Sequence, residues 1–114
     1  MYSTTIHLVK PLLTHGGPVS VLVLSEPTGR DYLRLGEPVV WGRNPDGTVF
    51  TAENEEVIRG YIDASLPDSV DSFVIDQACL EDAMNIKAAV LDFFRAAQGR
   101  RSAQSSTTSS STPE

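Results

Sequence analysis

The sequence predicts an α+β domain with an N-terminal β-hairpin, a small second hairpin, three to four helices and a disordered C-terminal tail. β-branched and alternating apolar residues are concentrated before residue 51, which favours strands. Apolar residues recur with a helical period in residues 51–98. Residues 102–114 contain almost no apolar side chain to offset the backbone entropy of folding. We therefore expect one domain over residues 1–99 and a disordered Ser/Thr-rich tail over residues 100–114.

The first predicted hairpin lies near the N-terminus. Ile6 and Leu8 alternate with polar residues, which indicates a strand, and Pro11 limits its continuation. Residues 14–18 form a turn cluster with two glycines. The run of residues 19–24 (VSVLVL) is nearly all apolar, so we expect a second strand that is covered on both faces.

A capping pattern follows the hairpin. Glu26 and Pro27 form a turn, and Thr28 is a good N-cap residue. Asp31 lies three residues after Thr28, as in a variant of the capping box. The pattern predicts a short helix over residues 29–35 and gives Glu26, Pro27, Thr28 and Asp31 structural roles.

The middle of the chain predicts a second hairpin and two helices. Residues 39–41 and 48–50 flank an Asp-Gly turn, and this hairpin carries Trp41, the single tryptophan. Thr51 is expected to open the next helix, whose first turn is rich in glutamate. Apolar residues at helical spacing give that helix one buried stripe, and a short third helix is expected near residues 70–78.

The clearest predicted element is a helix over residues 82–98. Asp82 is a suitable N-cap, and Gly99 is expected to end the helix. One face of this helix is apolar and the opposite face is polar. The apolar face consists of Ile86, Ala89, Val90, Phe93, Phe94 and Ala97.

Composition excludes several classes of protein. The formal net charge is −6, which disfavours binding to nucleic acid or to anionic membrane surfaces. No apolar run approaches the ~18 residues of a membrane-spanning helix, and we recognise no secretory signal at the N-terminus. Cys79 is the single cysteine, so an internal disulfide is impossible.

The sequence indicates no catalytic, metal-binding or cofactor-binding residues. His7 and His15 are the only histidines, and neither belongs to a recognisable triad or ligand spacing. Acidic neighbours of Cys79 disfavour a reactive thiolate. The glycine pair at residues 16–17 lacks the remainder of a phosphate-binding loop, and the glutamates of residues 53–56 fit a helix start.

The large aromatic residues are the best candidates for a partner surface. Phe93 and Phe94 are adjacent, so they point about 100° apart on a helix and widen its apolar stripe. We expect Phe93 chiefly in the core, whereas Phe94 and Trp41 leave partner binding and self-association open. The predicted partner-binding residues are Trp41, Ile86, Val90, Phe93 and Phe94.

Several segments of the chain carry a family resemblance. The strand of residues 6–10, Pro11, the strand of residues 21–24 and the motif SEPTGRDY (residues 25–32) resemble the start of the tail assembly chaperones of long-tailed bacteriophages, in the Mu-like branch. The helix of residues 80–94 resembles the end of that family's domain. Residues 41–50 are an insertion relative to compact members.

The resemblance implies a non-catalytic function. Proteins of this family hold the largely helical tape measure protein in solution and help recruit major tail tube protein around it. They act in the cytoplasm of the bacterial host and are absent from the mature virion, and many also have a longer frameshifted form. A structural tail subunit, such as a tube or completion protein, is the alternative; a small enzyme or host-directed inhibitor is a further competitor.

Overall fold

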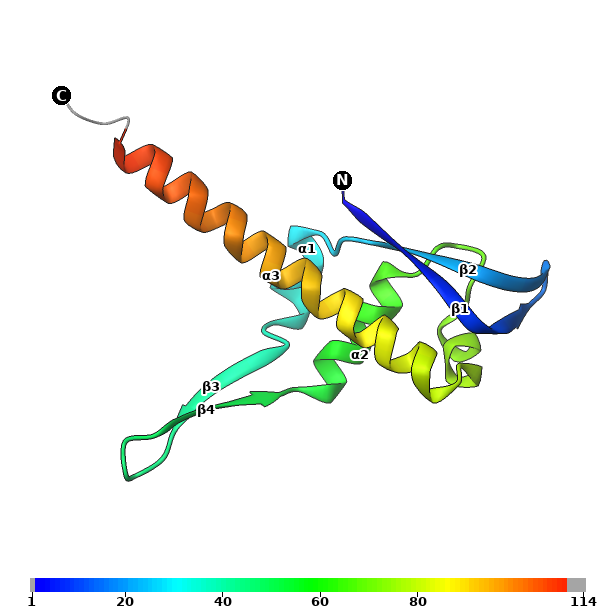
Figure 1. Cartoon of the computed structure of the whole chain (residues 1–114), viewed down its shortest axis with the longest axis horizontal. Coiled ribbons are helices and arrows are strands. Elements are labelled where there is room, and N and C mark those ends of the chain that lie inside the picture. The colour runs from blue at the N-terminus through cyan, green and yellow to red at the C-terminus, as the bar shows by residue number, and fades with distance from the viewer. Residues whose placement is uncertain (1, 111–114) are drawn as a thin grey trace.

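A computed structural model describes the backbone of residues 2–110 and the side chains of residues 2–103. It confirms the α+β class, with two antiparallel hairpins and a long final helix that runs between them (Figure 1). In chain order the elements are β1 (Ser3–Thr14), β2 (Gly17–Ser25), α1 (Gly29–Leu35), β3 (Val39–Arg43), β4 (Val49–Glu53), α2 (Glu55–Ser65), the 3₁₀ helix η1 (Ser72–Gln77) and α3 (Leu80–Ser110).

The β1–β2 hairpin contains a bulge that the sequence analysis missed. The strands pair in register from Ser3 to His7, and the register then shifts before Leu12 pairs with Val19. Pro11 lies inside this irregular segment, where its missing N–H removes no ladder hydrogen bond. The prediction that Pro11 limits the strand is therefore wrong, because the bulge absorbs the proline and β1 continues to Thr14.

The hairpin is covered on one face only. Leu22 and Leu24 of β2 are fully buried, whereas Val21 and Val23 between them are exposed. The prediction of a strand covered on both faces is therefore wrong. The physical reason is that only one layer of helices packs against this two-stranded sheet, so alternate side chains of β2 face solvent.

Asp82 fastens the bulge of β1 to the start of α3. Its fully buried carboxylate accepts hydrogen bonds from the backbone N–H groups of Val9 (2.9 Å) and Lys10 (3.0 Å). The Cys79 thiol donates a third hydrogen bond to it (3.2 Å). Asp82 is thus not an N-cap as predicted, because α3 begins at Leu80 and places Asp82 inside its first turn.

The short helix α1 is confirmed with its capping box. The Thr28 hydroxyl accepts a hydrogen bond from the Asp31 N–H, and the Asp31 carboxylate accepts one from the Thr28 N–H, both at 3.2 Å. Gly36 ends the helix with a positive φ of 87°, which favours glycine. Leu35 packs closely on Gly60 of α2, where an added Cβ would lie 2.8 Å from a Leu35 methyl group.

The second hairpin is confirmed, but the helix after it starts later than predicted. Thr51 and Glu53 belong to β4, and Asn54 is the N-cap of α2 through its side chain. The cross-strand pairing of residues 49–53 with β3 outweighs the local helical signal of the glutamates. The β3–β4 hairpin projects away from the other elements as an arm (Figure 1).

The core lies where β1–β2, α2, η1 and α3 meet. Arg59 of α2 ties η1 in place by donating to the Asp76 carboxylate (2.7 Å) and to the Ser72 carbonyl (2.7 Å). The predicted stripe of α2 is buried except for Val57, which is half-buried. The buried apolar residues are Ile6, Leu12, Leu22, Leu24, Ile58, Tyr61, Ile62, Val70, Val74, Ile75, Ile86, Ala89, Val90 and Phe93.

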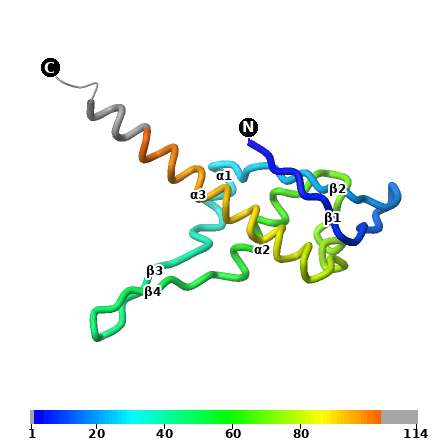
Figure 2. Tube along the Cα trace, viewed as in Figure 1, coloured from blue at the N-terminus to red at the C-terminus, as the bar shows by residue number. Residues whose placement is uncertain are grey.

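Helix α3 continues beyond its predicted end at Gly99. The helix reaches Ser110, and the part of it that is coloured in Figure 2 already leaves the body of the molecule. A single helical glycine costs only about 1 kcal/mol relative to alanine, which good helix formers on either side can offset. The boundary predicted between residues 99 and 100 is therefore not a helix end. Disorder of residues 100–114 in solution stays a prediction, and residues 111–114 lie outside the described part of the chain.

Replacing Asp82 with asparagine should destabilise the domain, because the amide has one acceptor oxygen where the carboxylate has two. The hydrogen bond from the Val9 N–H is the largest influence lowering the pKa of the Asp82 carboxyl, and burial opposes it. A lowered pKa in the folded state stabilises the fold above the unfolded value of about 3.9, and this stability is lost as the pH falls through the folded pKa. Urea unfolding between neutral and acidic pH should show a weaker acid dependence for D82N than for wild type. The exposed neighbour provides the control: E81Q should retain the wild-type profile.

Replacing Thr28 with alanine should lower the free energy of unfolding by about 0.5–2 kcal/mol, because the helix loses its N-cap acceptor. Chemical denaturation of T28A and of T28S measures this cost, and serine should restore most of the stability. A T28A protein as stable as wild type would contradict the structural role of Thr28.

Candidate binding groove between α1 and α3

A groove of about 510 Å³ lies between the β2–α1 loop, α1 and the middle of α3. Its floor is aromatic and aliphatic, and its rim is charged. A groove of this size falls within the range of ligand and peptide sites. The lining residues are Glu26, Pro27, Thr28, Gly29, Tyr32, Glu37, Phe93, Phe94, Ala97, Gln98, Arg100 and Arg101.

An aromatic stack forms the floor. The Phe94 ring lies edge-on to Tyr61, with centroids 4.7 Å apart, and tilted against Tyr32 at 6.5 Å. The Tyr61 hydroxyl donates to the Gly36 carbonyl (2.5 Å), which joins the end of α1 to α2 beneath the groove. Edge-on and tilted ring pairs of this kind add stability beyond the area they bury. The floor is therefore a packed aromatic surface whose rings support one another.

Arginines of α3 form one rim. Arg100 lies 4.2 Å from the centroid of the Tyr2 ring and pairs with Glu26 at 2.6 Å. The ladder of β1 and β2 continues into this corner, because the Glu26 N–H donates to the Tyr2 carbonyl (2.9 Å). These contacts fix the N-terminal strand, the β2–α1 loop and α3 around one end of the groove.

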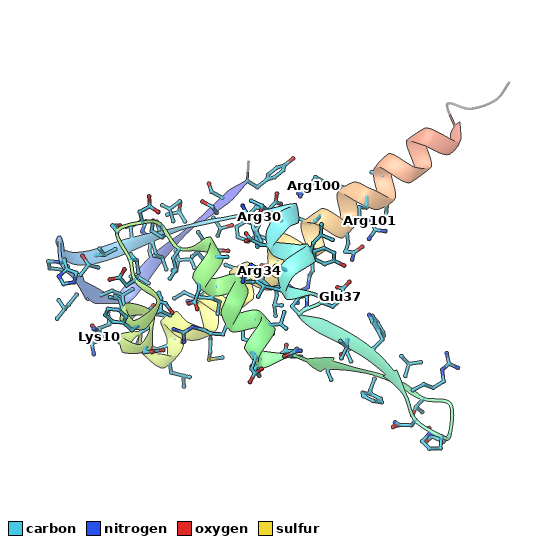
Figure 3. All side chains as sticks on the ribbon, turned by 180° about the vertical axis from the view of Figure 1, so that it is seen from behind. Lys10, Arg30, Arg34, Glu37, Arg100 and Arg101 are labelled. Carbon is cyan, nitrogen blue, oxygen red and sulfur yellow. The ribbon has the colours of Figure 1, made fainter. Side chains whose placement is uncertain are left out.

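Two further charged residues line the groove: Arg101 on α3 and Glu37, which follows the end of α1. Figure 3 labels Arg100 and Arg101 on α3 and Glu37 just beyond the end of α1. The Tyr32 hydroxyl donates to the Glu37 carboxylate. A rim that carries both positive and negative charges next to an apolar floor is typical of a surface that binds an amphipathic segment.

The hydroxyl groups in and beneath the groove are neutral at physiological pH. Burial raises the pKa of Tyr61 to about 12. The hydrogen bond to Glu37 raises the pKa of Tyr32 above its ordinary value. Both tyrosines therefore act as hydrogen-bond donors, Tyr61 to the backbone and Tyr32 to a carboxylate. Glu26 is engaged by Arg100 and Glu37 by Tyr32, so the two groove glutamates have structural partners.

The predicted partner-binding residues divide among three places. Phe93 and Phe94 line the groove, and Phe94 is half-buried while only 6% of Phe93 is exposed. Ile86 and Val90 are buried in the core, so their prediction as partner-binding residues is corrected to core residues. Of the apolar stripe of α3, the residues nearer the C-terminal end, Phe94 and Ala97, remain half-buried. Trp41 lies on the β3–β4 arm, outside the groove, and 75% of it is exposed.

Sequence patterns did not place Tyr2, Tyr32, Arg100 and Arg101 in a shared site. No short motif joins these residues, because the groove unites the N-terminus, α1 and α3. The structural residues Glu26 and Thr28 also line it, which sequence reasoning did not foresee.

The side chains most suited to catalysis or metal binding lie apart from one another. His7 and His15 are exposed on the first hairpin, while Cys79 is half-buried beside Asp82. Among the residues that the structure describes, no cluster of three histidine, cysteine, aspartate or glutamate side chains could hold a metal ion. Over the same residues, none of the helices combines the length and the apolar character needed to cross a membrane.

Comparison with models of protein families, with curated proteins and with solved structures found no match to this chain.

Replacing Tyr61 with phenylalanine should lower the free energy of unfolding by about 0.5–1.5 kcal/mol, because the buried Gly36 contact loses its donor. The matched control is Y32F, whose exposed hydroxyl faces a carboxylate in solvent and whose removal should leave the stability nearly unchanged. Thermal and urea unfolding of both variants measure the difference. Equal stability losses would show that the Tyr61–Gly36 bond has no special role.

Proposed function

We propose that this protein is a non-catalytic assembly chaperone that binds an apolar face of a partner helix. The groove between α1 and α3 is the observation that carries the proposal. Its floor of Tyr32, Phe94 and Ala97 is apolar and its rim is charged, as an amphipathic helix requires. Half-buried aromatic residues at the centre of such a surface are the usual energetic anchors of binding.

The packing of the floor supports the same proposal. Phe94 is held between two tyrosines, and Tyr61 is bonded to the end of α1. A preorganised surface loses little side-chain entropy on binding, so it retains more of the contact energy as affinity. The groove can therefore hold a client without first having to fold around it.

The family resemblance supplies the identity of the client. We infer that the client is the tape measure protein of a long-tailed phage, a long and largely helical protein. In this proposal the chain keeps the tape measure protein in solution in the bacterial cytoplasm, helps recruit major tail tube protein and leaves before the virion matures. The negative net charge of the chaperone opposes aggregation of the complex.

Co-expression of this chain with the tape measure protein encoded beside it tests this function. We expect a complex that stays in solution, whereas the tape measure protein alone precipitates, and light scattering gives the stoichiometry. Mass spectrometry of purified virions separates the chaperone from a structural tail subunit, since only a subunit is retained there. Failure of the folded chain to bind an intact tape measure protein would overturn the proposal.

A groove-filling substitution locates the client site. Ala97 is half-buried and lines the groove, while Ala96 is exposed on the same helix and does not line it. A97W should fill the space above Phe94 and reduce client capture at least about tenfold, the equivalent of ~1.4 kcal/mol. A96W is the matched control and should bind as wild type does. Equal binding by both variants would place the client elsewhere on the molecule.

A further inference from the structure

The β3–β4 arm has no role in the groove and exposes an unusual set of side chains. Both of its strands are exposed along almost their whole length, and two strands alone are marginally stable in water. Phe50 lies across Gly42, where an added Cβ would come within 2.3 Å of the ring. Four large apolar side chains remain exposed on the arm: Val40, Trp41, Val49 and Phe50.

Two hydrogen bonds fix which backbone groups face outward. The Asn44 N–H donates to the Thr48 carbonyl (2.8 Å), and the Asn54 N–H donates to the Pro38 carbonyl (2.8 Å). Hydrogen-bonded and non-hydrogen-bonded pairs alternate along an antiparallel ladder. Residues 40 and 42 therefore bond to β4, while Val39, Trp41 and Arg43 direct their N–H and C=O groups to the free edge.

The geometry points to a second copy of this chain as the occupant of that edge. We propose that two copies pair β3 with β3 in antiparallel fashion, about a two-fold axis at Trp41, to form a four-stranded sheet. The outward groups of residues 39, 41 and 43 then meet those of residues 43, 41 and 39 of the second copy. A strand whose free groups are symmetric about its centre complements itself, as a two-fold interface requires.

This arrangement gives the exposed apolar side chains new neighbours. On one face Trp41 lies opposite Trp41 of the second copy, which is a favourable cross-strand pair. On the other face Val40 of the second copy lies beside Gly42 and the Phe50 ring that covers it. Pairing through β4 would instead be centred on Thr51 and would leave the two tryptophans at opposite outer strands.

Charge favours the same register. Arg43 is the only charged residue of β3, and the two-fold places it opposite Val39 of the second copy and never opposite itself. Its side chain can extend across Val39 toward Glu53 of the second copy, because Glu53 pairs with Val39 on the same face. There Arg43 would join Lys87, whose ammonium group lies 2.6 Å from the Glu53 carboxylate of the same chain. Arg43 makes no ion pair within the described part of the chain.

Cysteine cross-linking tests the register directly, in a C79S background that keeps a donor for Asp82. Directly opposite hydrogen-bonded residues have Cα atoms about 5.5 Å apart, within the range that a disulfide spans. Under mild oxidation W41C should form a covalent dimer. T51C is the matched control: its two copies would lie about 14 Å apart across three strand spacings, so it should stay monomeric.

Sedimentation of the unmodified chain provides the second measurement. Five-residue strands bury less than a standard interface, so we expect a monomer–dimer equilibrium that depends on concentration. W41K should weaken the dimer roughly tenfold by replacing the aromatic pair with like charges, while L33K, at an exposed site on α1, should not change it. A strictly monomeric wild-type chain, or cross-linking of T51C in preference to W41C, would overturn the proposal.

Discussion

The fold depends on one buried carboxylate. A bulge in β1 leaves the N–H groups of Val9 and Lys10 without ladder partners, and Asp82 receives both. An unpartnered backbone N–H inside a protein costs free energy comparable to a lost hydrogen bond. The carboxylate therefore makes the bulge tolerable and, because it belongs to α3, also sets where that helix crosses the hairpin. The position of α3 in turn decides where Phe93 and Phe94 meet α1.

Local sequence patterns were sufficient to predict the structure of segments whose conformation depends mainly on neighbouring residues. The Thr28–Asp31 capping box, the Asp-Gly turn of the second hairpin and the apolar stripe of α3 all lie within a few residues of the structures that they specify. The α+β class could therefore be predicted. The errors arose where contacts with residues distant in the sequence determine the local structure. Thr51 and Glu53 belong to β4 and not to the predicted helix, and Pro11 lies in the bulge within β1.

The groove was only partly predictable for the same reason. An amphipathic pattern shows that Ile86, Val90, Phe93 and Phe94 are on one side of a helix, but not which of them the other elements cover. The hairpin strand β1 and α2 cover the first part of this stripe, and α1 approaches it near Phe94. Tyr2 and Arg100 meet across nearly the whole chain, and no sequence pattern connects them.

The molecule is extended for its length. Its radius of gyration is 17.3 Å, compared with about 13 Å for a compact chain of this size. The arm and the outer part of α3 account for the difference, as both leave the body in Figure 1. Such projections increase the surface available for contacts while adding little to the core. The groove, by contrast, belongs to the body, where Phe93 joins it to the core.

The distance along the chain between Asp82 and the bulge has a consequence for biosynthesis. The N-terminal hairpin leaves the ribosome long before the residue that completes it, 73 positions later. Until α3 arrives, Leu12, Leu22 and Leu24 lack the part of their cover that this helix supplies, and the nascent hairpin exposes part of its apolar face. A chain interrupted before residue 82 would keep that face open, so proteolysis or chaperone binding of incomplete chains should act first at the N-terminal hairpin.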